Sequence, residues 1–98
     1  MSEIRIVATV IAKDNEVDFV KAATKSIVEP SNKDEGCLQY ELHQDNANPN
    51  IFIFFEIWKD QKSLDKHNGT QHLKDFIEKI EDKIDSLDVK LISKIAYY

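Results

Sequence analysis

Two segments of the chain alternate like β-strands and are nevertheless apolar on both sides. In residues 4–12 only Arg5 and Thr9 are polar, and in residues 51–58 only Glu56 is. Strands that are buried on both faces have this composition. We therefore predict that the two segments are the central strands of one sheet.

Two other segments are apolar on one side only, as half-buried strands are. The first follows the turn Asp34-Glu35-Gly36, and the second is expected over residues 87–98. The turn-forming residues 46–50 would join the first of them to residues 51–58 as a hairpin. The inward positions are expected to be Leu38, Tyr40 and Leu42 in the first strand, and Leu87, Val89, Leu91, Ile95 and Tyr97 in the second.

The segment between the first strand and the hairpin has apolar residues at helical spacing, so we predict a helix there. We expect Asp14 or Asn15 to cap this helix and Pro30 to end or kink it, so that it reaches about Glu29. One face of the helix carries the core residues Val17, Val20, Ala23, Thr24 and Ile27.

The second helical region is predicted to be broken. Asp60 can cap a short helix that ends near His67, and Gly69 is expected in the left-handed conformation that stops a helix. Thr70 can then cap a longer helix. That helix has an apolar stripe of Leu73, Phe76, Ile77, Ile80 and Ile84.

The order β-α-β-β-α-β predicts a single ferredoxin-like α+β domain over residues 1–98, with a four-stranded antiparallel sheet. Right-handed crossovers place both helices on the same side of the sheet. The opposite face of the central strands would then expose an apolar patch. We therefore expect a two-fold homodimer in which two sheets pack face to face.

Charge and composition narrow the range of partners. The chain has 13 Lys and Arg against 18 Asp and Glu, a formal net charge of −5, and no basic block. Nucleic acid and anionic membranes are therefore not expected as partners. The first residues do not have the pattern of a signal peptide, and with a single cysteine, Cys37, we expect a cytoplasmic protein.

Nucleotide cofactors and metals are also not expected. With only Gly36 and Gly69, the sequence has no glycine-rich phosphate loop. His67 and His72 are five residues apart across the predicted helix break, whereas metal-binding pairs on one helical face are three or four apart. We therefore predict no cofactor and no metal.

Three polar residues are candidates for chemistry. Glu56 shares an apolar strand face with Phe54 and Trp58, where a carboxyl group needs a partner or a pocket. An ion pair or a backbone hydrogen bond at the strand end would also explain it. His72 in the first turn of a helix would favour neutral imidazole, the form of a general base, whereas His67 lies at a helix C-terminus. Ordinary surface or capping roles for the two histidines remain open.

The motif Glu35-Gly36-Cys37-Leu38-x-Tyr40, followed by Glu56-x-Trp58, Leu64-x-x-His67 and Thr70-x-His72, resembles the antibiotic-biosynthesis monooxygenase superfamily over nearly the whole chain. The resemblance implies a dimeric ferredoxin-like α/β barrel, and an enzyme that oxygenates quinols or polycyclic phenols without a cofactor. Where the haem-degrading branch has Asn, Trp and His, this chain has Val7, His67 and Ile77. The resemblance therefore does not extend to haem degradation.

From the residues and the resemblance together, the expected ligand is a small-molecule substrate. We expect His72 to be the catalytic base, with His67 as its alternate and Glu56 as an orienting group. The substrate-binding residues would be Trp58, Phe54 and Tyr40. Two alternatives remain open: an isomerase or lyase that acts on a small carbonyl compound or a phosphorylated sugar-derived signal, and a non-catalytic ligand-binding or stress-response dimer.

Overall fold

A computed structural model describes residues 3–97 and has the ferredoxin-like α+β fold. The strands are β1 (Ile4–Ala12), β2 (Cys37–Gln44), β3 (Ile51–Trp58) and β4 (Ile84–Ile92). They form one antiparallel sheet in the order β2-β3-β1-β4, so the two segments that are apolar on both sides are the central strands. This confirms the expected sheet.

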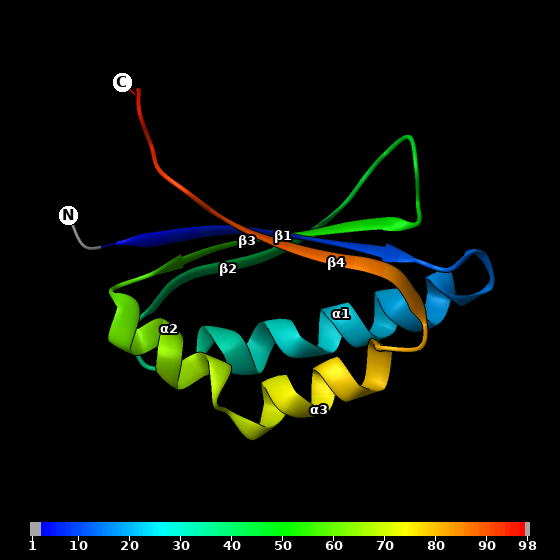
Figure 1. Cartoon of the computed structure of the whole chain (residues 1–98), viewed down its shortest axis with the longest axis horizontal. Coiled ribbons are helices and arrows are strands. Elements are labelled where there is room, and N and C mark those ends of the chain that lie inside the picture. The colour runs from blue at the N-terminus through cyan, green and yellow to red at the C-terminus, as the bar shows by residue number, and fades with distance from the viewer. Residues whose placement is uncertain (1–2, 98) are drawn as a thin grey trace.

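The helices are α1 (Val17–Asn32), α2 (Gln61–Asn68) and α3 (Gln71–Ile80), and all lie against the same face of the sheet (Figure 1). The even-numbered residues of β3, including Glu56 and Trp58, are buried beneath them. None of the described helices lies against the other face of the sheet (Figure 1). No helix in residues 3–97 is long and apolar enough to cross a membrane.

The start and the end of α1 differ from the prediction. Residues 14–16 form a short 3₁₀ turn, and the side chains of Asp14 and Asn15 cap neither that turn nor α1. The helix continues past Glu29 to Asn32 with Pro30 in its last turn. Proline keeps a helical φ but cannot donate a hydrogen bond to the carbonyl of Ser26 and crowds it, and only Ser31 and Asn32 follow before the helix ends.

The second helical region is broken as predicted, and both expected caps form. Asp60 accepts a hydrogen bond from the backbone N–H of Ser63, and Thr70 accepts one from that of Leu73. The left-handed conformation expected at Gly69 is wrong, because its φ is −94° and its ψ 0°. The left-handed glycine is Gly36, with a φ of +82°.

Three strand predictions also need correction. Leu38 lies at an irregularity in the β2–β3 pairing and is 54% exposed, so it does not share the buried face with Tyr40. Ile84 belongs to β4 instead of α3, because a turn follows Ile80. β4 ends at Ile92, whereas the prediction ran to Tyr98, which lies outside the described residues.

Candidate active site

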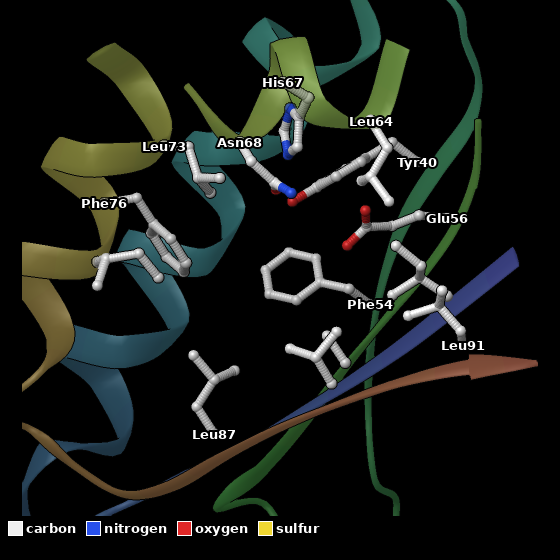
Figure 2. A pocket seen from close by; sticks show the side chains of 14 residues that line it. Tyr40, Phe54, Glu56, Leu64, His67, Asn68, Leu73, Phe76, Leu87 and Leu91 are labelled. Carbon is white, nitrogen blue, oxygen red and sulfur yellow. The ribbon is translucent and has the colours of Figure 1, made fainter. Parts of the chain in front are cut away.

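An apolar cavity of about 260 Å³ lies between the sheet and the helices α2 and α3. Side chains of Phe54, Phe76 and Leu87 line it from β3, α3 and β4 (Figure 2). On the β4 side, Val89 and Leu91 line the cavity and remain more than half exposed. The cavity is thus open to ligands along this edge.

Three polar side chains interrupt the apolar lining: Tyr40 from β2, Glu56 from β3 and His67 from α2 (Figure 2). All three are at least 93% buried. Asn68 adds an amide from an exposed position at the end of α2. Such a cavity, mostly apolar with a few convergent polar groups, is the usual form of a small-molecule site.

Glu56 is held in place by its neighbour on the same strand face. The indole N–H of Trp58 donates a hydrogen bond of 2.9 Å to Oε1 of Glu56, which leaves Oε2 free. Burial raises the pKa of Glu56, and the hydrogen bond from Trp58 opposes part of this shift. The carboxyl group can therefore keep its proton at a higher pH than an exposed glutamate does.

His67 is fixed by stacking and by a carboxylate. Its ring lies 4.4 Å from that of Trp58, centroid to centroid, and its Nδ1 lies 2.7 Å from Oδ2 of Asp34. An ionised carboxylate only accepts hydrogen bonds, so Nδ1 must carry the hydrogen. The Nε2 of His67 then has its lone pair free, and the ring extends toward the cavity (Figure 2).

The same oxygen of Asp34 also contacts His72. The Nε2 of His72 lies 2.9 Å from it, so Asp34 accepts hydrogen bonds from two imidazoles. The exposed fraction of the side chain rises from 3% at His67 through 15% at Asp34 to 30% at His72. We call these three residues the Asp34 cluster.

Two turns bring the Asp34 cluster together. Asp34 follows α1, and backbone hydrogen bonds to Ser31 and from Cys37 fix its position. The break between α2 and α3 places His67 and His72 on the same side. Burial lowers the pKa of His67, although Asp34 opposes this shift, so the neutral form of the His67 imidazole is favoured.

The six side chains singled out in the sequence separate into two groups. Four of them line the cavity: Tyr40, Phe54, Glu56 and His67. Trp58 and His72 do not line it; Trp58 is fully buried behind Glu56 and His67, and His72 contacts Asp34 on the outer side. The roles assigned to all six remain predictions.

Sequence reasoning missed Asp34 and Asn68. Asp34 directly precedes the Glu35-Gly36 pair, so it was assigned to a turn. Its partners are 33 and 38 residues away, and no local spacing indicates such a contact. The available signal was indirect. The ring N–H groups of two histidines at a helix break need a hydrogen-bond acceptor, and a carboxylate in the turn before a neighbouring strand can provide one.

The chain resembles known proteins over most of its length. Residues 4–79 match the family described as antibiotic biosynthesis monooxygenase. An uncharacterized protein of Synechocystis is 33% identical over 86 residues, 88% of this chain and 58% of that protein. YcnE of Bacillus subtilis, whose name assigns a monooxygenase activity provisionally, is 36% identical over 62 residues, 63% of this chain and 64% of that protein.

The chain therefore spans about three fifths of the length of these two curated relatives. Among solved structures, PA3566 from Pseudomonas aeruginosa superposes with a TM-score of 0.92 at 27% identity, covering 98% of this chain and 97% of that one. The match to the family extends over both central strands, the Asp34 turn and the two histidines. The chain belongs to the antibiotic biosynthesis monooxygenase family.

Proposed function

We propose that the protein is a cofactor-independent monooxygenase that acts on a small quinol or a related uncharged phenol. The observation that supports this most strongly is the position of His67. Its Nδ1 is tied to Asp34, and its Nε2 is left as a free base beside an apolar cavity. A neutral imidazole held in this way by a carboxylate is suited to removing a proton from a bound hydroxyl group.

This proposal makes His67 the base in place of His72. The ring of His67 borders the cavity, whereas His72 is not part of the lining and contacts Asp34 instead. Asp34 acts as a positioning residue, because its negative charge fixes the tautomer of His67 and stabilises the imidazolium that forms. Glu56, through its free Oε2, would orient a second substrate hydroxyl.

The reaction can be balanced without an added reductant. His67 removes a phenolic proton, and the electron-rich anion then transfers electrons to O₂ as a carbon–oxygen bond forms on the ring. Loss of water from the resulting hydroperoxide gives a hydroxyquinone, so that quinol plus O₂ yields hydroxyquinone plus water. The substrate supplies all four electrons, and the apolar lining keeps bulk water from the reactive anion.

The lining favours an uncharged substrate. Among the described residues that border the cavity there is no Lys or Arg, and the polar groups are a carboxyl, a phenol, an imidazole and an amide. A phosphorylated sugar derivative would bring a charge of about −2 into this surface without a cation to pair with it. The same base could serve an isomerase, but that reaction would not consume oxygen.

A homodimer is part of this proposal. On the open face of the sheet, Val7, Ile53, Phe55 and Ile57 form an apolar strip along the two central strands. Such a strip favours burial against a second copy of the same face. Sedimentation should give twice the 11.3 kDa mass of the chain, and Phe55→Lys should dissociate or unfold the dimer. A monomer at low micromolar concentration would contradict the arrangement.

The reaction is tested by oxygen uptake in the presence of EDTA with a panel of uncharged quinols, polycyclic phenols and sugar phosphates. We expect uptake with at least one quinol, with one oxygen atom of ¹⁸O₂ recovered in the product. Turnover of a carbonyl compound without oxygen uptake would favour the isomerase. Binding of these compounds without any turnover would favour a non-catalytic binding protein.

A further inference from the structure

The Asp34 cluster has the donor groups of a transition-metal site. One carboxylate oxygen and two imidazole nitrogens, from Asp34, His67 and His72, all lie within 4.8 Å of one another. They come from the turn after α1, the end of α2 and the start of α3. Because folding alone brings these three groups together, the site would be preformed. The five-residue spacing of the histidines argued against a metal site because pairs on one helical face are three or four residues apart; that rule does not apply here, since His67 ends α2 and His72 begins α3.

We propose that Asp34, His67 and His72 bind a divalent transition-metal ion such as Zn²⁺, and that the bound ion switches off the base of the proposed monooxygenase. Two nitrogen ligands and one oxygen favour an ion of borderline softness over Mg²⁺ or Ca²⁺, which prefer oxygen. Three protein ligands would leave a fourth position for water.

The distances in the cluster are compatible with an ion after small side-chain rotations. In a tetrahedral zinc site, neighbouring ligand atoms lie about 3.3 Å apart. Asp34 now lies 2.7 Å from Nδ1 of His67 and 2.9 Å from Nε2 of His72, as expected of hydrogen bonds. Insertion of the ion would replace both hydrogens, so these two distances would lengthen by about 0.5 Å, and the two imidazole nitrogens, which lie within 4.8 Å of each other, would move to about 3.3 Å apart.

An ion can reach the cluster from outside the apolar cavity. A separate polar hollow of about 170 Å³ borders Asp34 and His67, between the turn after α1 and the helix α2. Its two cations are each matched by a carboxylate: Lys66 lies 2.6 Å from Glu35, and Lys33 lies 3.7 Å from Glu29. Repulsion of an incoming cation is therefore reduced, and the charge of Asp34 remains to attract it.

The effect of the ion on the base follows from the tautomer of His67. In the metal-free cluster Nδ1 donates to Asp34, and the lone pair is on Nε2 at the cavity. An ion takes the lone pair of Nδ1, so the hydrogen of the neutral imidazole must move to Nε2. Nε2 then becomes a donor and can no longer remove a proton. This inhibitory step rests on the proposed function, whereas the binding of the ion does not.

The binding is tested by titrating untagged protein with Zn²⁺ in a calorimeter. We expect one site in the wild type, and about 10- to 100-fold weaker binding in His72→Ala and Asp34→Asn, since changing a residue that only hydrogen-bonds to a metal ligand already has an effect of this size. His43→Ala is the matched control, because His43 also lies 2.9 Å from a carboxylate, that of Glu41, but has no third ligand. No binding, or binding lost only in His43→Ala, would overturn the site.

Two measurements on the wild type keep the test independent of variants that fold poorly. In ¹⁵N spectra, Zn²⁺ should move the hydrogen of His67 from Nδ1 to Nε2, and an unchanged tautomer would overturn the proposal. Co²⁺ should give an absorption spectrum without a thiolate charge-transfer band. Such a band would assign the ion to Cys37, whose pKa burial raises to about 11, and would equally overturn it.

The inhibition is tested separately, by oxygen uptake with a quinol that the enzyme turns over. Zn²⁺ should inhibit, and EDTA should restore the rate. If Zn²⁺ binds at the cluster but uptake is unaffected, the metal site stands and the switch is overturned. If no quinol is turned over, the proposed function fails, while the calorimetric result still decides the site.

Discussion

Among residues 3–97, histidines contact carboxylates in two places, at similar distances but in very different surroundings. His72 lies 2.9 Å from Asp34 in the Asp34 cluster, and His43 lies 2.9 Å from Glu41 on β2. The cluster also includes His67, which is 3% exposed, whereas the side chains of the β2 pair are 60% and 44% exposed. Distance alone therefore does not distinguish a chemical site from a surface contact.

The two places differ in the burial of the histidine and in whether a second side chain holds its ring. In water the β2 pair contributes little, and its imidazole is free to change tautomer and rotamer. In the cluster, Trp58 stacks on one side of His67 and Asp34 accepts its Nδ1 hydrogen, so the ring has one orientation and one tautomer. Only the buried imidazole borders an apolar cavity. The following predictions test this contrast, beginning with the largest expected effect.

Replacing the two histidines should have unequal consequences. His67→Ala should lower the turnover of an active quinol by about 10² to 10⁴, the range for loss of a general base. His43→Ala should leave turnover unchanged, because His43 borders neither the cavity nor the cluster. Initial rates of oxygen uptake measure both, with thermal unfolding as a control for folding. Equal rates of oxygen uptake in the two variants would contradict the assignment of His67 as the base.

Replacing the two carboxylates should have a smaller effect in the same direction. Asp34→Asn keeps the shape of the side chain but removes the charge that fixes His67, so turnover should fall by about 10²-fold. Glu41→Gln should have no effect on turnover. If Asp34→Asn were as active as wild type, Asp34 would be a structural residue of the turn.

The two glycines provide a comparison of stability. A Cβ at Gly36 would lie 2.0 Å from Oγ of Ser63, at a φ of +82°, so Gly36→Ala should destabilise the fold by at least about 1–2 kcal/mol. At Gly69 a Cβ meets only backbone oxygens at 3.6 and 3.8 Å. Gly69→Ala should therefore be neutral or stabilising by up to about 1 kcal/mol. Urea unfolding of both variants checks the order, and the reverse order would contradict this account of the turn.

The smallest effect concerns pH and two glutamates. Burial raises the pKa of Glu56, so its contribution to stability is present below its unfolded pKa and is lost as pH rises through the folded value. Hydrogen bonds from His43 and then Gln39 lower the pKa of Glu41, so its contribution is present at higher pH and is lost as pH falls.

Thermal unfolding of wild type, Glu56→Gln and Glu41→Gln between pH 4 and pH 8 separates the two glutamates. The melting temperature of wild type should fall relative to that of Glu56→Gln as pH rises. Relative to Glu41→Gln it should show a much weaker trend of the opposite sign, since Glu41 is exposed. A constant difference between wild type and Glu56→Gln would mean that Glu56 ionises as freely in the folded state as in the unfolded chain.

Residues 4–12 and 51–58 were predictable as central strands, because successive residues of a strand lie on opposite faces of a sheet and both faces are apolar in these segments. The caps at Asp60 and Thr70 were predictable for a similar reason, since each acts within three residues of its position. The limits of α1 and β4 were predicted less accurately. Pro30 is compatible with the end of a helix and with its last turn, and Ile84 is compatible with the apolar stripe of a helix and with the start of a strand.

The site was only partly predictable. Glu56 stood out because a carboxyl group on an apolar strand face is costly unless it has a partner. Which histidine borders the cavity depends on how α2 and α3 cross the sheet, and no local pattern contains that angle. Asp34 was predictable only as a turn residue, because its position in the cluster depends on contacts with residues far along the chain.

The most direct test of the central claim is the tautomer of His67 in the metal-free protein, measured at neutral pH by long-range ¹H–¹⁵N correlation. All three histidines are observed in one spectrum. We predict that His67 is neutral, with its hydrogen on Nδ1 and its lone pair on Nε2, and that the exposed His43 has no such fixed tautomer. A hydrogen on Nε2 of neutral His67, or a His67 protonated on both nitrogens, would contradict its assignment as the base.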